Sequence, residues 1–222
     1  KKTRHRILIL GDSMVFSYGV ADEHTFPAQL GRILNDVVTD GFEVMNFGVS
    51  GYNTYDEWSL YKTLGAKTDP DLVILMIVSN DHEYRKEIAD SSPGLDAVRR
   101  SLSSDSGSHL LRWIRHAILS REYMEYYKEL KSRPNYLDRV MDPLNKLITQ
   151  LKKTDVDLLL ILLPNGGVNT AELDRGEYAK IAETVEKRGV TYIDLAESRF
   201  LYSFEEPGEG NIFLKDGHFN PK

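Results

Sequence analysis

The apolar run Ile7–Leu10 leads directly into the turn Gly11–Ser13, and this stretch constrains the fold more than any other part of the chain. Four apolar residues stopped by glycine predict a short buried strand. The residues that follow, up to Asp36, are predicted to be mostly helical, so Ser13 is expected where a strand ends and a helix begins. Open α/β sheets place their ligand sites at such points, where free backbone N–H groups favour developing negative charge. Ser13 is therefore a candidate nucleophile, with a helix cap as its alternative role.

Strands and helices are predicted to alternate along the rest of the chain. Short buried strands are expected at residues 44–47, 72–78, 158–163 and 190–195. The seven successive apolar residues Leu72–Val78 are typical of a central parallel strand that is covered on both faces. Apolar residues at helical spacing mark four helices, namely Phe26, Leu30, Ile33, Leu34 and Val37; Tyr55, Trp58, Tyr61 and Leu64; Leu137, Val140, Met141, Leu144, Leu147, Ile148 and Leu151; and Tyr178, Ile181, Ala182 and Val185. This alternation predicts a parallel sheet with right-handed crossovers, whose strands all have their carboxyl ends at one edge.

The segment at about residues 85–133 departs from this alternation. A length of 222 residues suits a single domain spanning 1–222. The segment is longer than an ordinary connection between a strand and a helix, and it contains a helix candidate between Leu110 and Leu130. We therefore expect a helical insertion over the strand ends, either as a lid or as another packed helix pair.

Composition narrows the classes of function. The formal net charge is −6 and no basic patch dominates, so nucleic acid is not an expected partner. Cysteine is absent, which removes disulfides, thiolate catalysis and cysteine metal sites. Nucleotide-binding fingerprints are absent too, so no cofactor is expected. The histidines other than His218 lack the spacing of metal ligands, so no metal is expected either.

The same survey bears on localisation. No apolar run approaches the roughly 18 residues that indicate a membrane span, and no signal peptide is visible. The sequence opens at Lys1 with no initiator methionine. A cytoplasmic protein and an exported or periplasmic one that has lost an N-terminal signal or anchor are both compatible with these observations.

Polar residues follow three of the predicted strands, and another polar group lies near the end of the sequence. Acyl transfer from an ester needs a nucleophile, a base, a group that orients the base, and donors for the oxyanion. Ser13 can be the nucleophile, His218 the base, and Asp216 the group that holds the imidazole in the right tautomer. The candidate oxyanion donors are the backbone N–H groups of Ser13 and Gly51 and the side-chain amide of Asn80.

Four further polar residues lie beside these candidates. Asp12 and Asp81 are expected to hold their loops through hydrogen bonds with the backbone, and Asn46 is expected to do the same. His82 follows Asn80 and Asp81 directly, so it is a candidate to line the pocket.

These residues resemble the pattern of the SGNH hydrolases, also called the GDSL esterase/lipase family. The family is named for a serine, a glycine, an asparagine and a histidine in four separate blocks. Residues 11–13 look like the first block, 46–51 the second, 80–81 the third and 216–218 the block that holds the histidine. Val78 departs from the pattern because the third block usually has glycine there. In the family as a whole the acid commonly lies three residues before the histidine. Here it lies two residues before it, as in some carbohydrate-related branches and in SGNH-like acyltransferases that modify polysaccharides.

The resemblance implies both a fold and an activity. The fold is a three-layer α/β/α flavodoxin-like architecture with a central parallel five-stranded sheet in the order 2-1-3-4-5. The activity is that of a serine esterase or lipase, which hydrolyses small-molecule or carbohydrate esters through a triad of Ser13, His218 and Asp216 and an acyl-enzyme. The alternatives are an O-acyltransferase or deacetylase acting on carbohydrate hydroxyls, and a non-catalytic glycan-binding module on the same fold. The oligomeric state is left open.

Overall fold

The computed structural model describes residues 3–17, 20–39, 41–83, 128–163 and 171–195, with only the backbone described for 171–175. The chain divides into two compact units, residues 1–81 together with 140–222, and residues 82–139. Most of the segment 85–133 lies outside the described residues, so the helical insertion and the single-domain organisation stay predictions.

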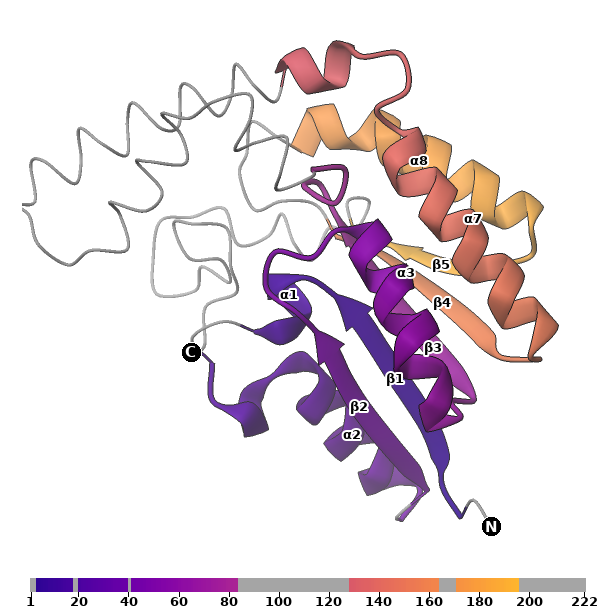
Figure 1. Ribbon diagram of the computed structural model, residues 1–222. Helices are drawn as coiled ribbons and strands as arrows, with labels where there is room; N and C mark the ends of the chain where they lie inside the picture. Colours follow the sequence, from indigo (N-terminus) through magenta and orange to yellow (C-terminus); the bar gives the residue numbers. More distant parts are fainter. Residues whose placement is uncertain (1–2, 18–19, 40, 84–127, 164–170, 196–222) are drawn as a thin grey trace, which may run out of the picture. The chain divides into compact units, whose positions relative to one another are not determined.

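The first unit is built on a parallel sheet of five strands (Figure 1). The strand order is β2-β1-β3-β4-β5, and every pairing is parallel. The strands are β1 (His5–Gly11), β2 (Phe42–Gly48), β3 (Leu72–Val78), β4 (Asp157–Leu163) and β5 (Thr191–Asp194). This confirms the predicted fold class and strand order, with β3 at its predicted bounds and the ends of the other strands within two residues of theirs.

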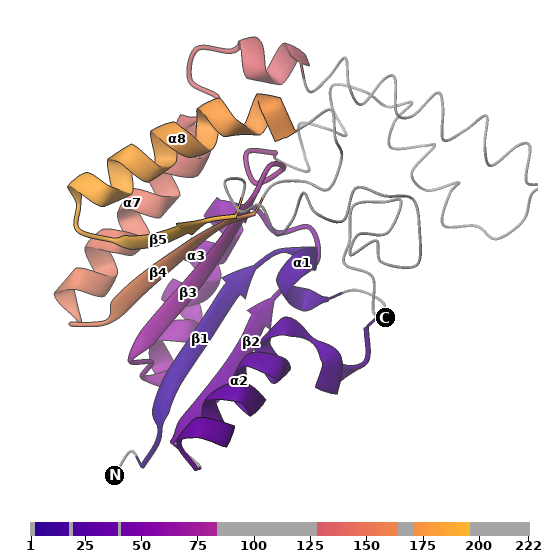
Figure 2. The same ribbon diagram turned by 180° about the vertical axis from the view of Figure 1, so that it is seen from behind.

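Helices cover both faces of the sheet. Figures 1 and 2 show α2 against one face and α3 and α7 against the other. The described helices are α1 (Ser13–Phe16), η1 (Asp22–His24), α2 (Phe26–Val37), α3 (Thr54–Thr63), η2 (Gly65–Thr68), α7 (Asp138–Lys153) and α8 (Ala171–Lys187). The opposite faces follow from chain direction, because right-handed crossovers that move in opposite directions along a sheet put their helices on opposite sides.

The core is centred on β1 and β3, which lie between other strands and are covered on both faces. Leu8, Leu10 and Leu75 are completely buried, in accord with the unbroken apolar run that marks a central strand. The residues that alternate with them pack on the α2 side, in a cluster of Ile7, Ile9, Met14, Val15, Ile74, Met76, Val78, Ile161 and Leu163. Burial of these side chains is the main favourable contribution to the stability of the unit.

The helix predicted up to Asp36 is interrupted in the structure. α1 has only four residues and ends at Ser17, whose φ of 60° is left-handed, and α2 begins after the cap residue Thr25. Ser13 is the first residue of α1, and the cap is Asp12. The alternative role of Ser13 as a helix cap is therefore wrong.

The face predicted for α3 is right at Tyr61 and wrong at Tyr55 and Leu64. The buried residues are Thr54, Glu57 and Tyr61, whereas Tyr55 and Leu64 are 43% and 53% exposed. An α-helix turns by about 100° per residue, so two residues nine apart lie on opposite sides of it. A strict spacing of three, as in the predicted set, therefore drifts around the helix instead of marking one face.

The predicted face of α2 is partly right. Phe26, Leu30 and Leu34, four residues apart, pack against the core cluster. Ile33 and Val37 are 54% and 81% exposed. The difference arises because α2 covers the edge strand β2, so the sheet meets only one ridge of the helix. By contrast, five of the seven residues predicted for the apolar face of α7 are buried, namely Val140, Leu144, Leu147, Ile148 and Leu151.

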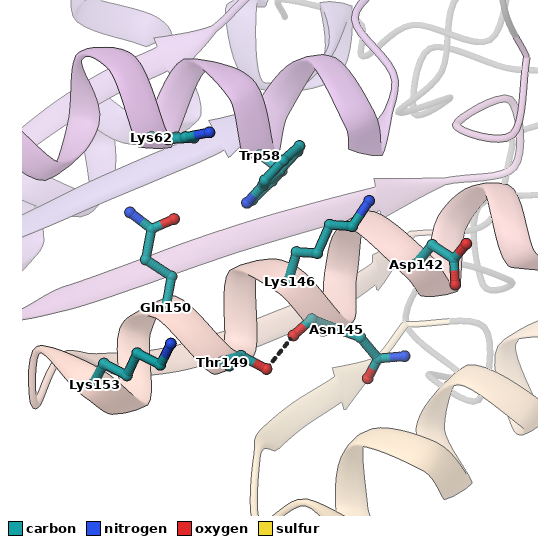
Figure 3. A pocket seen from close by; sticks show the side chains of 8 residues that line it. All are labelled: Trp58, Lys62, Asp142, Asn145, Lys146, Thr149, Gln150 and Lys153. Atoms are coloured by element: carbon teal, nitrogen blue, oxygen red, sulfur yellow. Dashed lines mark hydrogen bonds between the residues drawn. The ribbon is translucent and has the colours of Figure 1, made fainter.

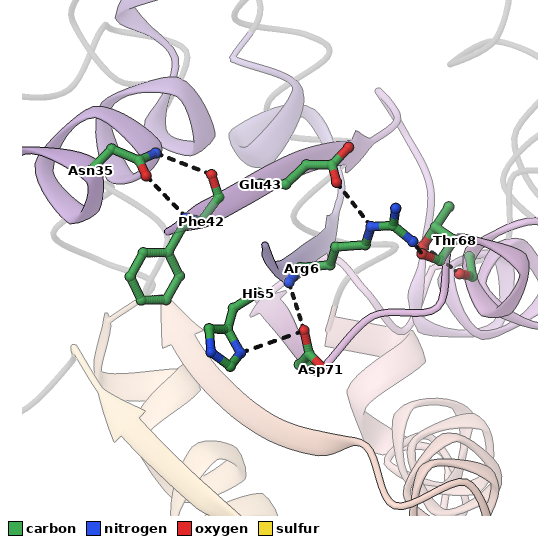
Figure 4. A network of polar contacts seen from close by, with 8 residues as sticks. His5, Arg6, Asn35, Phe42, Glu43, Thr68 and Asp71 are labelled. Carbon is green, nitrogen blue, oxygen red and sulfur yellow. Dashed lines mark hydrogen bonds and ion pairs between the residues drawn. The ribbon is translucent and has the colours of Figure 1, made fainter. Parts of the chain in front are cut away.

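A polar network at the amino ends of the strands ties β1 to its neighbours (Figure 4). The Arg6 Nε donates to Glu43 Oε2 on β2 at 2.9 Å, and its Nη1 donates to the Thr68 carbonyl at 2.8 Å. The backbone N–H of Arg6 donates to Asp71 Oδ2 at 2.7 Å, just before β3. These contacts link β1 to β2 and β3 at the end opposite the candidate site.

Two glycines let α1 lie against the carboxyl ends of β1 and β2. A Cβ on Gly48 would lie 2.7 Å from the carbonyl carbon of Val15 and would overlap the backbone nitrogen of Phe16. A Cβ on Gly11 would overlap the Val15 side chain. The turn that holds Ser13 therefore depends on the absence of side chains at both positions.

We expect Gly48→Ala to destabilise the protein by about 3 kcal/mol, because its Cβ would meet backbone atoms of α1 that cannot move independently. The matched control is Gly176→Ala in α8, where an added Cβ meets nothing within 4 Å. That change should stabilise by up to about 1 kcal/mol, since alanine favours a helix interior over glycine. Chemical denaturation of both variants checks this, and equal stabilities would contradict it.

Candidate active site

Asp12 holds the turn that carries Ser13. The Asp12 carboxylate accepts the backbone N–H of Met14 at 2.8 Å and the Ser13 hydroxyl at 3.2 Å. Asp12 is 2% exposed, whereas Ser13 is partly exposed at the carboxyl end of β1. The expected loop-holding role of Asp12 is confirmed by the first of these bonds. The second gives the Ser13 hydroxyl a defined orientation.

Asn46 joins the same turn to the neighbouring strand. Its side-chain amide donates to the Val15 carbonyl at 3.3 Å and accepts from the Gly48 N–H at 2.9 Å. The expected backbone bonds of Asn46 are thus confirmed. They hold α1 against the end of β2, in addition to the close packing that Gly48 allows.

Gly51 lies in a tight turn after β2. The Tyr52 N–H donates to the Val49 carbonyl at 3.0 Å, and Gly51 has a φ of 75°. A turn with positive φ at its third residue is of type II, which favours glycine at that position. The Val49 N–H donates to the Gly11 carbonyl at 3.0 Å, so the turn starts beside the end of β1.

Asn80 lies in a second turn, after β3. The Asp81 N–H donates to the Val78 carbonyl at 3.2 Å, and the Val78 N–H donates to Asp81 Oδ2 at 3.0 Å. These reciprocal bonds confirm that Asp81 holds its loop. They close the turn with Val78 in the place where glycine was the expected residue, so the departure from the family pattern does not prevent a tight loop here.

The sheet brings these three turns to one edge. β1 lies between β2 and β3, and Gly11 pairs with Gly48 at the end of β2. Because parallel strands all end at the same edge, and neighbouring strands are about 4.8 Å apart, the turns bearing Ser13, Gly51 and Asn80 leave the sheet from adjacent positions. Asp216 and His218 lie outside the described residues, so their positions stay predictions.

A buried acid that the sequence analysis did not single out lies in α3. Glu57 has no exposed surface, and within the described chain neither of its carboxyl oxygens has a hydrogen-bond partner. Burial above all, and then the negative charges of Asp12 and Asp56, raise the pKa of Glu57 well above its usual value. Glu57 is therefore neutral over a wider pH range than an ordinary glutamate. Its spacing of four from the buried Tyr61 was the available signal for this position.

His82 belongs to the second unit and is 3% exposed. Its ring meets the Tyr136 ring edge-on at 5.8 Å between centroids, and its carbonyl accepts from Arg139 Nη1 at 3.4 Å. Burial, followed by the positive charges of Lys131 and Arg139, lowers the pKa of His82 to about 3. An imidazole that titrates there is a poor general base at neutral pH. The expectation that His82 lines the pocket stays a prediction.

The described part of the chain bears on metal binding and on membrane insertion. No cluster of three or more histidine, aspartate or glutamate side chains there is arranged to hold a metal ion. None of the described helices combines the length and hydropathy of a membrane-spanning helix.

Comparison with known proteins identifies the family. The model of the GDSL-like lipase/acylhydrolase family matches residues 9–222, which include all four motif blocks. The chain belongs to this family. It is therefore a hydrolase of ester bonds, as the resemblance implied. No curated protein matches this GDSL hydrolase.

Solved structures share the fold of the GDSL hydrolase. A catalytic mutant of Axe2, an acetylxylan esterase from Geobacillus stearothermophilus, has a TM-score of 0.60 at 17% identity, covering 100% of this chain and 89% of that one. AlinE4, an SGNH-hydrolase family esterase, has a TM-score of 0.55 at 20% identity, with coverages of 100% and 88%. TesA has a TM-score of 0.56 at 17% identity, with coverages of 98% and 90%. At these identities the likeness is one of fold.

We expect Glu57→Gln to become increasingly stabilising as pH rises. A raised pKa means that the folded state of the wild type holds its proton more tightly, so wild-type stability falls as pH rises above 4.5 towards the folded-state pKa. Glutamine mimics the neutral acid and escapes this loss, which reaches about 1.4 kcal/mol per pH unit.

Chemical denaturation of the wild type and of Glu57→Gln at a series of pH values above 4.5 checks the expectation. Glu183→Gln is the control, because Glu183 is exposed on α8 and its pKa is lowered by a hydrogen bond from Lys187. The stability of Glu183→Gln relative to the wild type should not increase with pH. Parallel stability curves for wild type and Glu57→Gln would contradict the neutral state of Glu57.

Proposed function

We propose that this GDSL hydrolase is a serine esterase in which Ser13 is the nucleophile, His218 the base and Asp216 the acid that orients it. The observation that carries the proposal is the position of Ser13. It begins α1 at the carboxyl end of the central strand β1, partly exposed and with its hydroxyl bound by Asp12. Open α/β sheets bind ligands at this edge, beside the strand where the order of the sheet reverses.

The proposed reaction proceeds through an acyl-enzyme. His218 takes the Ser13 proton as Oγ attacks the ester carbonyl carbon, and the carbonyl electron pair moves to oxygen. The tetrahedral intermediate then collapses, the bond to the alcohol oxygen breaks, and His218 returns the proton to the departing alcohol. Water repeats these steps on the acyl-enzyme and releases the carboxylic acid and free Ser13.

Three donors are proposed for the oxyanion: the N–H groups of Ser13 and Gly51 and the side-chain amide of Asn80. Their turns follow three adjacent strands and are fixed by the backbone N–H groups of Met14, Tyr52, Asp81 and Val78. Donors held by other bonds need little rearrangement as charge develops on the substrate oxygen. Loss of one such donor typically lowers turnover on the order of 100-fold.

Attack by Ser13 requires its hydroxyl to leave Asp12. The bond to Asp12 Oδ2 is 3.2 Å long, which is weak for a hydroxyl donating to a carboxylate. A turn of the Ser13 side chain about its Cα–Cβ bond releases the proton towards another acceptor, with the backbone held by the Met14 bond. The resting bond therefore orients the hydroxyl without locking it.

The second candidate function acts on carbohydrates. The enzyme would either remove an acetyl group from a carbohydrate ester or transfer an acyl group to a carbohydrate hydroxyl. The fold match to the acetylxylan esterase Axe2, with a TM-score of 0.60, favours it. The spacing of two residues between Asp216 and His218 also favours it, since that spacing resembles carbohydrate-related branches of the family. Acetyl transfer to an oligosaccharide at a rate above hydrolysis would identify a transferase.

We expect Ser13→Ala and His218→Ala to lower the turnover of short p-nitrophenyl esters on the order of 10⁶-fold, because removing either residue removes the activated nucleophile. The matched controls are Ser59→Ala, within α3, and His24→Ala, at the end of η1. Both should retain wild-type turnover.

A fluorophosphonate probe provides a second measurement. It should add one covalent group to the wild type at Ser13, seen by intact mass and peptide mapping, and none to Ser13→Ala. Undiminished turnover in both triad variants would refute the assignment of these residues. A wild type that neither turns over esters nor reacts with the probe would favour the non-catalytic glycan-binding module.

A further inference from the structure

A groove lies between α3 and α7, in the unit that holds Ser13 (Figure 3). Its volume is about 590 Å³, within the range of ligand pockets. Two of its lining residues come from α3 and six from α7, namely Trp58, Lys62, Asp142, Asn145, Lys146, Thr149, Gln150 and Lys153. None of them has a part in the proposed ester chemistry.

The groove concentrates positive charge in an acidic protein. Lys62, Lys146 and Lys153 line it, and Asp142 is its one acidic lining residue. None of the three ammonium groups is paired with a carboxylate in the described part of the chain. The chain as a whole has a net charge of −6, so this local excess of cations is opposite in sign to the rest of the molecule.

Trp58 draws two of these cations together. The Nζ atoms of Lys62 and Lys146 lie 5.4 and 5.1 Å from the centroid of its ring. Both distances are within the range of cation–π attraction, for which tryptophan is the best partner. In Figure 3 the ring extends from α3 into the space that faces α7. The ring limits the freedom of the two long side chains before any ligand arrives, which reduces the entropy lost on binding.

The charges are spread along the groove. Lys146 and Lys153 are two helical turns apart on α7, or about 10.5 Å at 1.5 Å per residue. An isolated phosphate would use cations at one point, whereas cations at intervals suit a chain that carries an anionic group on repeating units. Gln150 adds an amide that both donates and accepts, as sugar hydroxyls require.

The groove also begins near the candidate active site. Crossover helices run opposite to parallel strands, so α3 and α7 start at the edge of the sheet where Ser13 lies. Trp58 is only one turn into α3, which follows the Gly51 turn after two residues. A chain bound in the groove would therefore extend towards that edge.

We propose that the groove between α3 and α7 binds an acidic oligosaccharide, a chain of uronic acid units whose carboxylates meet Lys62, Lys146 and Lys153. This inference rests on the carbohydrate-ester form of the proposed function and gives its substrate a charge. An acidic peptide has the charge but lacks the hydroxyls that Gln150 can bind.

The test is titration calorimetry of the Ser13→Ala protein with an oligogalacturonate, so that binding is measured without turnover. We expect binding that weakens as salt is raised, and none with a neutral xylo-oligosaccharide of equal length. The double variant Lys62→Gln with Lys146→Gln should bind at least about tenfold more weakly, because two charge contacts are lost. Lys180→Gln, exposed on α8, is the matched control and should bind as the parent does.

Three results would overturn the inference. These are equal binding of the neutral oligosaccharide, unchanged binding by the double variant, and tighter binding of a polyglutamate or of single-stranded DNA of equal charge. Melting curves show whether the double variant is folded. If it is not, Lys153→Gln, which is not in contact with Trp58, replaces it and should weaken binding by a smaller factor.

The test separates this inference from the proposed function. Esterase activity of the wild type without oligogalacturonate binding would refute the groove proposal alone. Binding by Ser13→Ala, with no ester turned over by the wild type, would refute the esterase alone.

Discussion

The central position of β1 is the constraint on which the candidate site depends. β1 pairs in parallel with β2 on one side and β3 on the other, and both of its faces are buried. The pairing fixes the register of the three strands. The Arg6 network reinforces this register at the amino end. At the carboxyl end, three polar turns leave from adjacent strands because the pairing allows no other arrangement.

The turns themselves are stiffened by short polar side chains that bind the backbone. Asp12, Asn46 and Asp81 each accept a backbone N–H at or next to a strand end. Such local bonds compete with regular structure, which is why these residue types suit the ends of strands and the caps of helices. The side chains proposed for catalysis are different ones, so the scaffold of the site and its chemistry reside in neighbouring residues.

Much of this could be predicted from sequence because it depends on short-range patterns. The apolar run of β3 needs no knowledge of its neighbours, and the turn residues are local signals. The inward face of α3 was missed at Glu57 because a spacing of three drifts around the helix, and the spacing of four between Glu57 and Tyr61 does not by itself show that an acid is buried. Burial of a charged residue is a property of the tertiary structure. The Lys146 and Trp58 pairing likewise joins helices far apart in the chain.

Glu57 and Asp12 are both buried, and burial followed by the negative charge of Asp12 raises the pKa of Glu57. Two interacting buried carboxyls rarely ionise together, and the charge settles where donors exist. Asp12 accepts a backbone N–H and a hydroxyl, whereas the Glu57 oxygens have no partner among the described residues. Asp12 is thus the acid of the two whose oxygens accept hydrogen bonds, and one of these bonds orients the Ser13 hydroxyl. A neutral Glu57 adds no second negative charge near the Asp12 carboxylate.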